Sequence, residues 1–533
     1  MLKKRILATL LGAAMLLTLA ACGSKPAGNS SAPNASGAGT NAPAAAFGGT
    51  LNVGISDALG SFQQGANQGD CWTGIYLVFD ALFYHDTETK EVYSYILDDW
   101  YYEDDLTFVM KLKDGVYFSN GQKATSEDVL YSLTNYAQRR AMTASMFSGV
   151  DAENSYCPDE LTTVVKFREP WGPGIFSVDS PLFCKSWCEE VGWDSQDWLN
   201  CPVGSGPYKV TSYVTDSKAT LALRDDFWGD ETMYNPDIKE ITLNYYPEIA
   251  TMFIDLQTGA IDLALNIAEA DYARGMNGID GITVERISTN ETEFLCMDTK
   301  NQYLKDENVR LAIAYGVDWS VVADAGFGSL QAPATSILSS ESPYYKDCGG
   351  YPYDLDKAKD YLAASGYSGE ELTFKFVAMA DADQQNMAEA FQFYMNQLGM
   401  TVNIEYLDFA SALGTWMEEG GTDFNFQESA TGSLSGEPYI SLNALMTAYG
   451  NFAICTVDDD QFNQLAERAM KTIDRDERAA AFAELQTYAH DHAWVIPMLE
   501  GYYALGYDNT VISAVDFGSA IGANLRHVTL AGQ

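Results

Sequence analysis

The stretch Pro202-Val203-Gly204-Ser205-Gly206-Pro207-Tyr208 decides how this chain is organised. Two prolines and two glycines within six positions cannot continue a helix or a central strand, so the backbone turns here. From Tyr208 to Val214 the residues then alternate in character, as they do in a half-buried strand. The pattern alone fits any tight loop. Together with the sequence around it, the stretch indicates a rigid corner that leads into a strand.

Length and charge narrow the class of protein. The chain has 533 residues, which is too long for one ordinary hydrophobic core and predicts two or three lobes. Hydrophobic residues make up 47%, a globular composition. The formal net charge is −43, with 31 basic residues against 74 acidic ones. Nucleic acid is therefore not expected as a partner, because binding phosphates requires a basic surface.

The first residues predict export and a lipid anchor. A basic start, Lys3-Lys4-Arg5, precedes an apolar run over residues 6–17 and then Leu19-Ala20-Ala21-Cys22. The run is too short to span a membrane and is typical of a signal peptide. Leu-Ala-Ala-Cys resembles the bacterial lipobox, in which the cysteine is lipidated and becomes the new N-terminus. We expect a signal peptide over 1–21, lipidation of Cys22, and a place on the outer face of the cytoplasmic membrane or in the periplasmic space.

A flexible tether is predicted over residues 22–48, which are rich in Gly, Ser, Ala, Asn and Pro. Beyond Cys22 the chain has eight more cysteines, an even number that could form disulfides or remain as buried free thiols. Only four histidines occur, and none lies near Cys184, Cys188 and Cys201. We therefore expect no metal site and no cofactor.

Local patterns predict several elements. The strand, helix and strand over residues 372–377, 384–398 and 401–407 indicate a parallel βαβ unit. A helix is expected over residues 354–365, closed by Gly366, and a buried helix over residues 72–83. Asp114-Gly115 is a hairpin signal.

Several stretches in order resemble the extracellular solute-binding proteins of ABC importers, in the large family that carries peptides, nickel and related solutes. Phe108 to Leu133 is similar to a family signature, and Pro202 to Val210 to its Pro-Val-Gly-Thr-Gly-Pro-Tyr motif, with Ser205 in place of threonine. Gly259-Ala260-Ile261-Asp262 and Asn308 to Asp318 continue the likeness into the second half. The resemblance spans residues 49 to about 499.

This resemblance implies an α/β fold of the two-lobed, periplasmic-binding-protein-like (venus flytrap) kind, with a hinge between the lobes. It implies a first lobe over 49–70, 201–280 and 493–533, a subdomain inserted into that lobe over 71–200, and a second lobe over 281–492. A peptide or similar small solute would be enclosed between the lobes and passed to the transmembrane permease of an ABC importer. The protein would act as a monomer held to the membrane by the lipid on Cys22.

The ligand contacts are the least defined part of the resemblance. Peptide-binding relatives hold the ligand's ammonium group with an acidic residue before an Asp/Glu-Pro step, and Leu434 stands where that acid is expected. Glu428 or Glu437 could replace it. From loops equivalent to those beside the family's cleft, the residues expected to bind ligand are Phe62, Trp72, Trp416, Gln427, Ser429 and Glu437.

Other classes remain as alternatives. The same fold could bind a chelated metal or an oligosaccharide. A secreted hydrolase is a rival from another class, but the chain contains neither a Gly-x-Ser-x-Gly elbow nor a His-Glu-x-x-His motif. We therefore do not expect an enzyme.

Overall fold

The computed structural model describes residues 47–62, 72–86, 89, 91–136, 149–172, 180–428, 438, 457–516 and 524–532. Within them lies a mixed 11-stranded sheet, whose order is β14-β13-β15-β11-β16-β10-β1-β9-β8-β7, with β12 paired to β16. Its strands are β1 (Thr50–Ile55), β7 (Tyr208–Val214), β8 (Lys218–Leu223), β9 (Glu240–Tyr245), β10 (Leu263–Ala264), β11 (Ile282–Met297), β12 (Gln331–Pro333), β13 (Thr373–Met379), β14 (Thr401–Leu407), β15 (Phe424–Glu428) and β16 (Ile496–Asp508).

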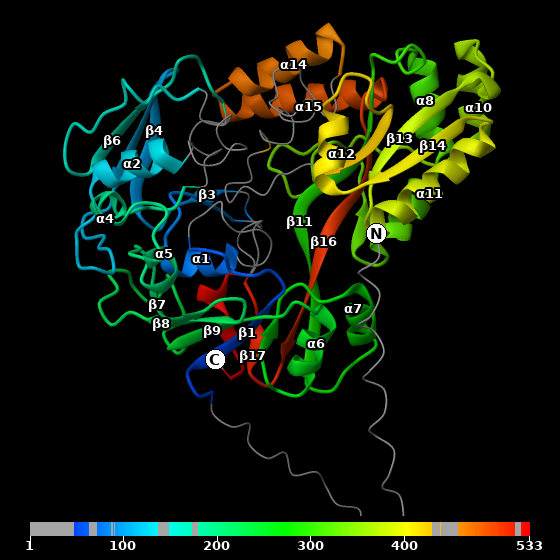
Figure 1. The fold of residues 1–533 in the computed structure, drawn as a ribbon. Helices are drawn as coiled ribbons and strands as arrows, with labels where there is room; N and C mark the ends of the chain where they lie inside the picture. The colour runs from blue at the N-terminus through cyan, green and yellow to red at the C-terminus, as the bar shows by residue number, and fades with distance from the viewer. Residues whose placement is uncertain are drawn as a thin grey trace, which may run out of the picture. The chain divides into compact units, whose positions relative to one another are not determined.

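Three smaller sheets and a set of helices complete the described part of the chain (Figure 1). The small sheets contain β2 (Tyr84–His85) with β3 (Val92–Tyr93), β4 (Leu97–Asp104) with β5 (Thr107–Leu112) and β6 (Thr162–Lys166), and β17 (Ile512–Ala514) with β18 (Thr529–Leu530). The helices are α1 (Trp72–Val78), α2 (Ser126–Tyr136), α4 (Lys185–Val191), α5 (Asp197–Asn200), α6 (Ile249–Gln257), α7 (Glu269–Met276), α8 (Glu307–Gly316), α9 (Trp319–Phe327), α10 (Leu355–Ser365), α11 (Ala382–Gln397), α12 (Phe409–Trp416), α14 (Asp460–Lys471) and α15 (Arg475–Asp491), with 3-10 turns η4 (Gly369–Glu371) and η5 (Leu525–His527).

The two long strands β11 and β16 connect two hydrophobic cores. They pair antiparallel from Ile282 with Asp508 to Leu295 with Ile496. Leu505 and Tyr507 of β16 belong to the first core, which also holds β1, β9 and the small sheets. Leu295 of β11 and Ile496 of β16 belong to the second core, beneath α8 to α11. The fold is therefore two-lobed, with β11 and β16 crossing from one lobe to the other.

The corner at Pro202 packs against the end of α1. A Cβ on Gly204 would lie 2.0 Å from the carbonyl oxygen of Val78, and one on Gly206 would lie 2.6 Å from that of Leu77. The N–H of Gly206 donates to Val78 O (2.8 Å), and the N–H of Asp80 donates to Ser205 Oγ (2.9 Å). The two glycines are therefore required because two backbones touch here.

This packing corrects the predicted helix over residues 72–83, because α1 ends at Val78. The corner takes the carbonyl of Val78 and the N–H of Asp80, so neither is available to extend the helix. Asp114-Gly115 forms a turn, with Gly115 at a φ of 94°, as predicted. The turn does not join two paired strands, because β5 pairs with β4 and β6 and not with the residues after Gly115. The hairpin in this region is the one between β4 and β5, which turns at residues 105–106.

The βαβ unit is confirmed. Strands β13 and β14 pair in parallel from Thr373 with Thr401 to Met379 with Leu407, and α11 connects them. Helix α10 starts after Asp354, whose side chain accepts from Lys357 N (2.9 Å), and ends at Gly366, which has a φ of 79°. The domain boundaries predicted from the sequence stay predictions.

Candidate ligand-binding site

The carboxyl ends of β13, β14 and β15 meet at one edge of the sheet in the second lobe. Strand β13 is parallel to both β14 and β15, and the three end at Met379, Leu407 and Glu428. In open α/β sheets the carboxyl ends of parallel strands are where ligands bind. The residues that follow these three strands are therefore the first candidates for a ligand site.

Carboxylates follow β13 and β14 at this edge. Asp381 caps α11 by accepting from Gln384 N (2.9 Å), and Asp408 caps α12 by accepting from Ser411 N (3.1 Å) and Ser411 Oγ (2.7 Å). Asp383 lies in the first turn of α11, where partial removal from water and the charge of Asp381 raise its pKa. The raised pKa means that Asp383 would gain electrostatically from a cationic partner.

Helix α12, which follows β14, has an exposed apolar side chain at each end. Phe409 opens α12 and is 64% exposed, and Met417 follows the helix and is 48% exposed. The opposite side of α12 is buried through Ala412 and Trp416, which pack on Val377 of β13. Single exposed apolar side chains are common on protein surfaces, so the position of Phe409 directly after β14, and not its exposure, makes it a candidate contact for a ligand.

A second group of polar residues lies at the middle of the crossover strands. The pairing of β11 with β16 is irregular between Ser288 and Thr292, and Asn290 there has a φ of 57°. Asn290 is 5% exposed, and its Oδ1 has no hydrogen-bond partner. Glu500 of β16 pairs with Thr292 and is also 5% exposed.

The carboxylate of Glu500 is held by the loop before α10. It accepts from Ser340 N (2.7 Å) and Ser340 Oγ (2.6 Å), and burial raises its pKa.

Buried polar atoms nearly always have a partner, and leaving one unpaired costs about 1–3 kcal/mol. The unpaired Oδ1 of Asn290 therefore marks a place where water or a ligand atom would be favoured.

Gln427 of β15 extends this polar group toward the strand end. It pairs with Phe294 of β11, and the next pair of the two strands is Glu293 with Glu428. Its Nε2 is buried and has no hydrogen-bond partner, and the same holds for Oδ1 of Asn425. Gln427, predicted as a ligand residue, therefore presents an unsatisfied donor close to the crossover strands.

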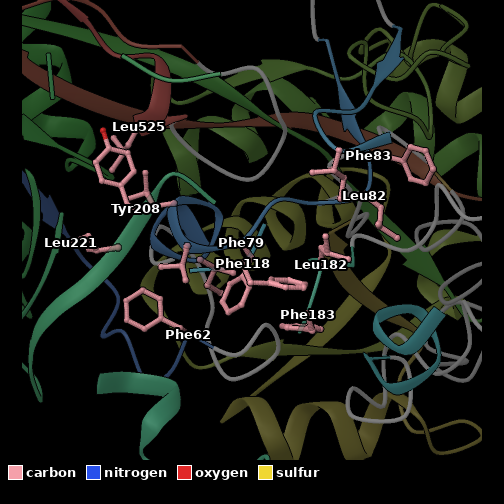
Figure 2. Packing of buried hydrophobic residues seen from close by; sticks show 14 of the residues in the cluster. Phe62, Phe79, Leu82, Phe83, Phe118, Leu182, Phe183, Tyr208, Leu221 and Leu525 are labelled. Carbon is pink, nitrogen blue, oxygen red and sulfur yellow. The ribbon is translucent and has the colours of Figure 1, made fainter. Parts of the chain in front are cut away.

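The other predicted site residues have different surroundings. Phe62 is fully buried in the first core, and Figure 2 shows it with Tyr208 and Leu221. Trp416 is 6% exposed and donates from Nε1 to Val377 O (3.0 Å). Trp72 is the first residue of α1, but its side chain lies outside the description, as do Cys22, Ser429 and Glu437 entirely. Ligand contact by these residues stays a prediction.

Sequence reasoning missed Phe409, Asp383, Asn290 and Glu500. A signal for the first two was available, because each follows directly after a predicted parallel strand or its turn, where ligands bind. No comparable signal exists for Asn290 and Glu500, since their burial depends on how two strands pair 200 residues apart along the chain.

The described residues contain no cluster of three or more His, Cys, Asp or Glu side chains arranged to hold a metal ion. Six cysteines in the same part of the chain are not joined in disulfides, namely Cys157, Cys184, Cys188, Cys201, Cys296 and Cys348. None of the helices in these ranges is long and apolar enough to cross a membrane.

Comparison with known proteins links this geometry to a family. The model of the bacterial extracellular solute-binding proteins, family 5 (Middle), matches residues 91–451. Heme-binding protein A of Haemophilus influenzae is 23% identical over 543 residues, which cover 93% of this chain and 94% of that protein.

Solved structures share the fold. The structure of HbpA2 from Haemophilus parasuis has a TM-score of 0.78 and 18% identity, covering 90% of this chain and 99% of its own. The dipeptide-binding protein from Pseudoalteromonas sp. SM9913, in complex with Met-Leu, has a TM-score of 0.71 and 17% identity, covering 90% and 100%.

Proposed function

The chain belongs to the bacterial extracellular solute-binding proteins, family 5, and from this premise we propose that it captures a peptide or a similar small solute between its two lobes and delivers it to the permease of an ABC importer. The observation that carries the proposal is the edge where β13, β14 and β15 end, with Asp383 and the exposed Phe409 beside it. Carboxylates and an exposed aromatic ring that follow neighbouring strand ends suit a ligand that has an ammonium group and an apolar side chain.

The clamp follows from the crossover strands. A ligand that contacts both lobes stabilises the closed arrangement by the difference between its affinities for the closed and open states. Because β11 and β16 pass between the cores, and their pairing is irregular at Asn290, the polar group around Asn290 and Glu500 lies where the two lobes would move relative to each other. A ligand that contacts Asn290 or Glu500 would therefore have contacts that change when the lobes close.

The predicted lipid anchor and the negative net charge of the protein fit the same role. We propose that Cys22 carries lipid and that residues 22–48 tether the folded body outside the cytoplasmic membrane. Removal of residues 1–21 takes away Lys3, Lys4 and Arg5 and no acid, so the formal charge becomes −43 − 3 = −46. Such a field speeds the capture of cationic solutes, while contacts within about 10 Å decide affinity because salt screens the rest.

A chelated metal or an oligosaccharide is the second candidate. Phe409 favours it, because an exposed aromatic ring stacks on a flat chelate or on a sugar ring as well as on an apolar side chain. A relative over nearly the whole chain carries the name Heme-binding protein A. In either case we propose binding without chemical conversion.

Native mass spectrometry of the purified protein tests the proposal. A complex with one small molecule, which is released unaltered, is the expected result. Conversion of that molecule into a new product, abolished by a substitution such as Asp383→Asn, would instead place the protein among enzymes.

The charge of the ligand is tested by Glu428→Gln and Glu437→Gln. Losing one partner of a buried charge pair costs about 3–5 kcal/mol, so at least about a tenfold loss of affinity is expected for a peptide or cationic solute. Calorimetry with unchanged affinity in both variants would favour a neutral solute such as a sugar.

A further inference from the structure

We propose that the inserted subdomain and the second lobe are fastened together by a clasp, which we define as Glu91 and residues 169–172 on one side and residues 470–475 on the other. The clasp shares no residue with the candidate ligand site and would set how readily the two lobes close. This inference rests on the proposed function, because it assumes that closure of the lobes accompanies ligand capture.

The centre of the clasp is a contact between two backbones. Gly172 N–H donates to Met470 O, with an N–O distance of 2.7 Å. A Cβ on Gly172 would lie 2.2 Å from Thr472 O, 2.8 Å from Arg478 Nε and 3.0 Å from Met470 O. Such distances leave no room for any residue other than glycine, so the turn between α14 and α15 fits directly onto this position.

Met470 lies at the end of α14 in the second lobe, but its side chain packs into the hydrophobic core of the first lobe. Its neighbours in α14, Phe462, Ala466 and Ala469, pack with α15 and with Phe294 of β11. Met470 itself is 8% exposed and packs into the first core instead. One helix end is therefore shared between the two lobes, and Figure 1 shows α14 and α15 in orange beside the subdomain of β4 to β6.

Both sides of the clasp are held in place from behind. In the second lobe, Arg478 is 2% exposed and donates from Nε to Ala469 O (2.9 Å), which fixes the end of α14. In the inserted subdomain, Tyr102 of β4 donates from its hydroxyl to Trp171 O (3.1 Å). Each surface is therefore fixed by a hydrogen bond within its own lobe, and preorganised surfaces lose little entropy on contact.

Two ion pairs flank the backbone contact, and both have the cation on the same side of the clasp. Lys471 Nζ lies 3.0 Å from Glu169 Oε2, and Arg475 Nη1 lies 3.1 Å from Glu91 Oε1. In each pair the second lobe supplies the cation and the inserted subdomain supplies the carboxylate. All four side chains are partly exposed, so the pairs guide the fit of the two surfaces and weaken as salt increases.

The clasp gives the protein a way to tune ligand affinity without changing a ligand contact. If only the closed state binds tightly, the apparent dissociation constant equals the intrinsic constant divided by the closed fraction. Weakening the clasp lowers that fraction, and therefore weakens binding of every ligand by the same factor. The groups that recognise ligand and the groups that favour closure are then separate.

Small-angle scattering of the purified full-length protein, with no solute added, tests the clasp. Gly172→Val is expected to raise the radius of gyration while the circular dichroism spectrum stays native. The matched control is Gly48→Val, since a Cβ on Gly48 would have no atom within 4 Å, and its radius should equal that of the parent. An unchanged radius for a folded Gly172→Val variant would overturn the proposal.

Reversing the charges of the two ion pairs tests the clasp independently if Gly172→Val does not fold. Lys471→Glu with Arg475→Glu should raise the radius at low salt, because each new carboxylate faces an old one. Adding Glu169→Lys and Glu91→Lys should restore the parent radius. No expansion, or expansion without restoration, would overturn the clasp. Neither result involves a ligand, so a failure of the proposed function would be recognised separately by its own binding experiment.

Discussion

Arg526 and Asp80 are 446 residues apart in the chain and form a buried ion pair, with 2.5 Å between Nη1 and Oδ1. Their side chains are 3% and 0% exposed. Arg526 also donates to the carbonyls of Tyr76 and Phe79 at the end of α1, while the N–H of Asp80 donates to Ser205 of the corner. The chain's last described segment, the first helix and the corner are therefore joined at one point.

Breaking this pair should destabilise the protein strongly. Asp80→Asn leaves the guanidinium of Arg526 buried without its countercharge, and such losses cost about 3–5 kcal/mol. Asp99→Asn is the control, because the pair of Asp99 with Lys111 is about half exposed and should cost less than about 1 kcal/mol. Chemical denaturation measures both, and equal losses would contradict the role of the buried pair.

The corner at Pro202 should tolerate threonine in place of Ser205, but not a side chain in place of Gly204. Ser205→Thr keeps the acceptor for Asp80 N–H, whereas Ser205→Ala leaves that buried donor unpaired at about 1–3 kcal/mol. Gly204→Ala forces α1 away from the corner, because its Cβ would lie 2.0 Å from Val78 O, and should cost about 3 kcal/mol. Thermal melts of the three variants should follow this order, and a parent-like melt for Gly204→Ala would refute it.

The stability of the protein should decrease in mild acid because of His527. Burial, together with the charge of Arg526, lowers the pKa of His527, although Asp516 acts in the opposite direction. The unfolded state takes up a proton near pH 6.5, while the folded state does so only at lower pH. The unfolded state therefore binds more protons in that window, and the free energy of unfolding should fall as pH drops below about 6.5.

His527→Gln should flatten this part of the pH profile. Tyr95→Phe serves as the control, because it removes the hydrogen bond between Tyr95 Oη and His527 Nε2 (3.0 Å) but keeps the titrating ring. Denaturation midpoints from pH 5 to 8 give the slopes. If His527→Gln keeps the slope of the parent, another group is responsible.

Ligand binding should depend on the carboxyl edge of the second lobe. Phe409→Ala removes the exposed ring, and aromatic contacts of this kind contribute about 1 kcal/mol beyond area burial, so affinity should fall at least about fivefold. Phe393→Ala is the control, since Phe393 is similarly exposed at 62% but lies on α11 away from the strand ends. Calorimetry with the co-purified solute should show a loss for Phe409→Ala alone.

Release from the membrane should follow from Cys22→Ala. Without the thiol no lipid can be attached, and the folded body should appear in the soluble fraction with an unchanged melting temperature. Cys201→Ala is a matched control, because Cys201 is an exposed free thiol. Membrane retention of Cys22→Ala at the level of the Cys201→Ala protein would exclude lipidation at Cys22.

The sequence by itself determined the elements whose signals are local. Helix α10 begins after Asp354 and ends at Gly366 as expected, because both cap interactions span three residues or fewer. The βαβ unit of β13, α11 and β14 was predictable for the same reason, since periodicity and the connection length define it. The family motifs in order along the chain identified the two-lobed fold, and the glycines of the corner motif are required because two backbones touch there.

Only the tertiary structure decided which distant residues meet. An aromatic residue such as Phe62 has the same pattern in a core and in a cleft, and its full burial depends on neighbours far along the chain. The pairing of Asp80 with Arg526, the burial of the unpaired Oδ1 of Asn290 and the fit of Gly172 against Met470 likewise arise from contacts across more than 200 residues. Such contacts leave no local period in the sequence, because their energy comes from burial and backbone approach rather than from spacing along the chain.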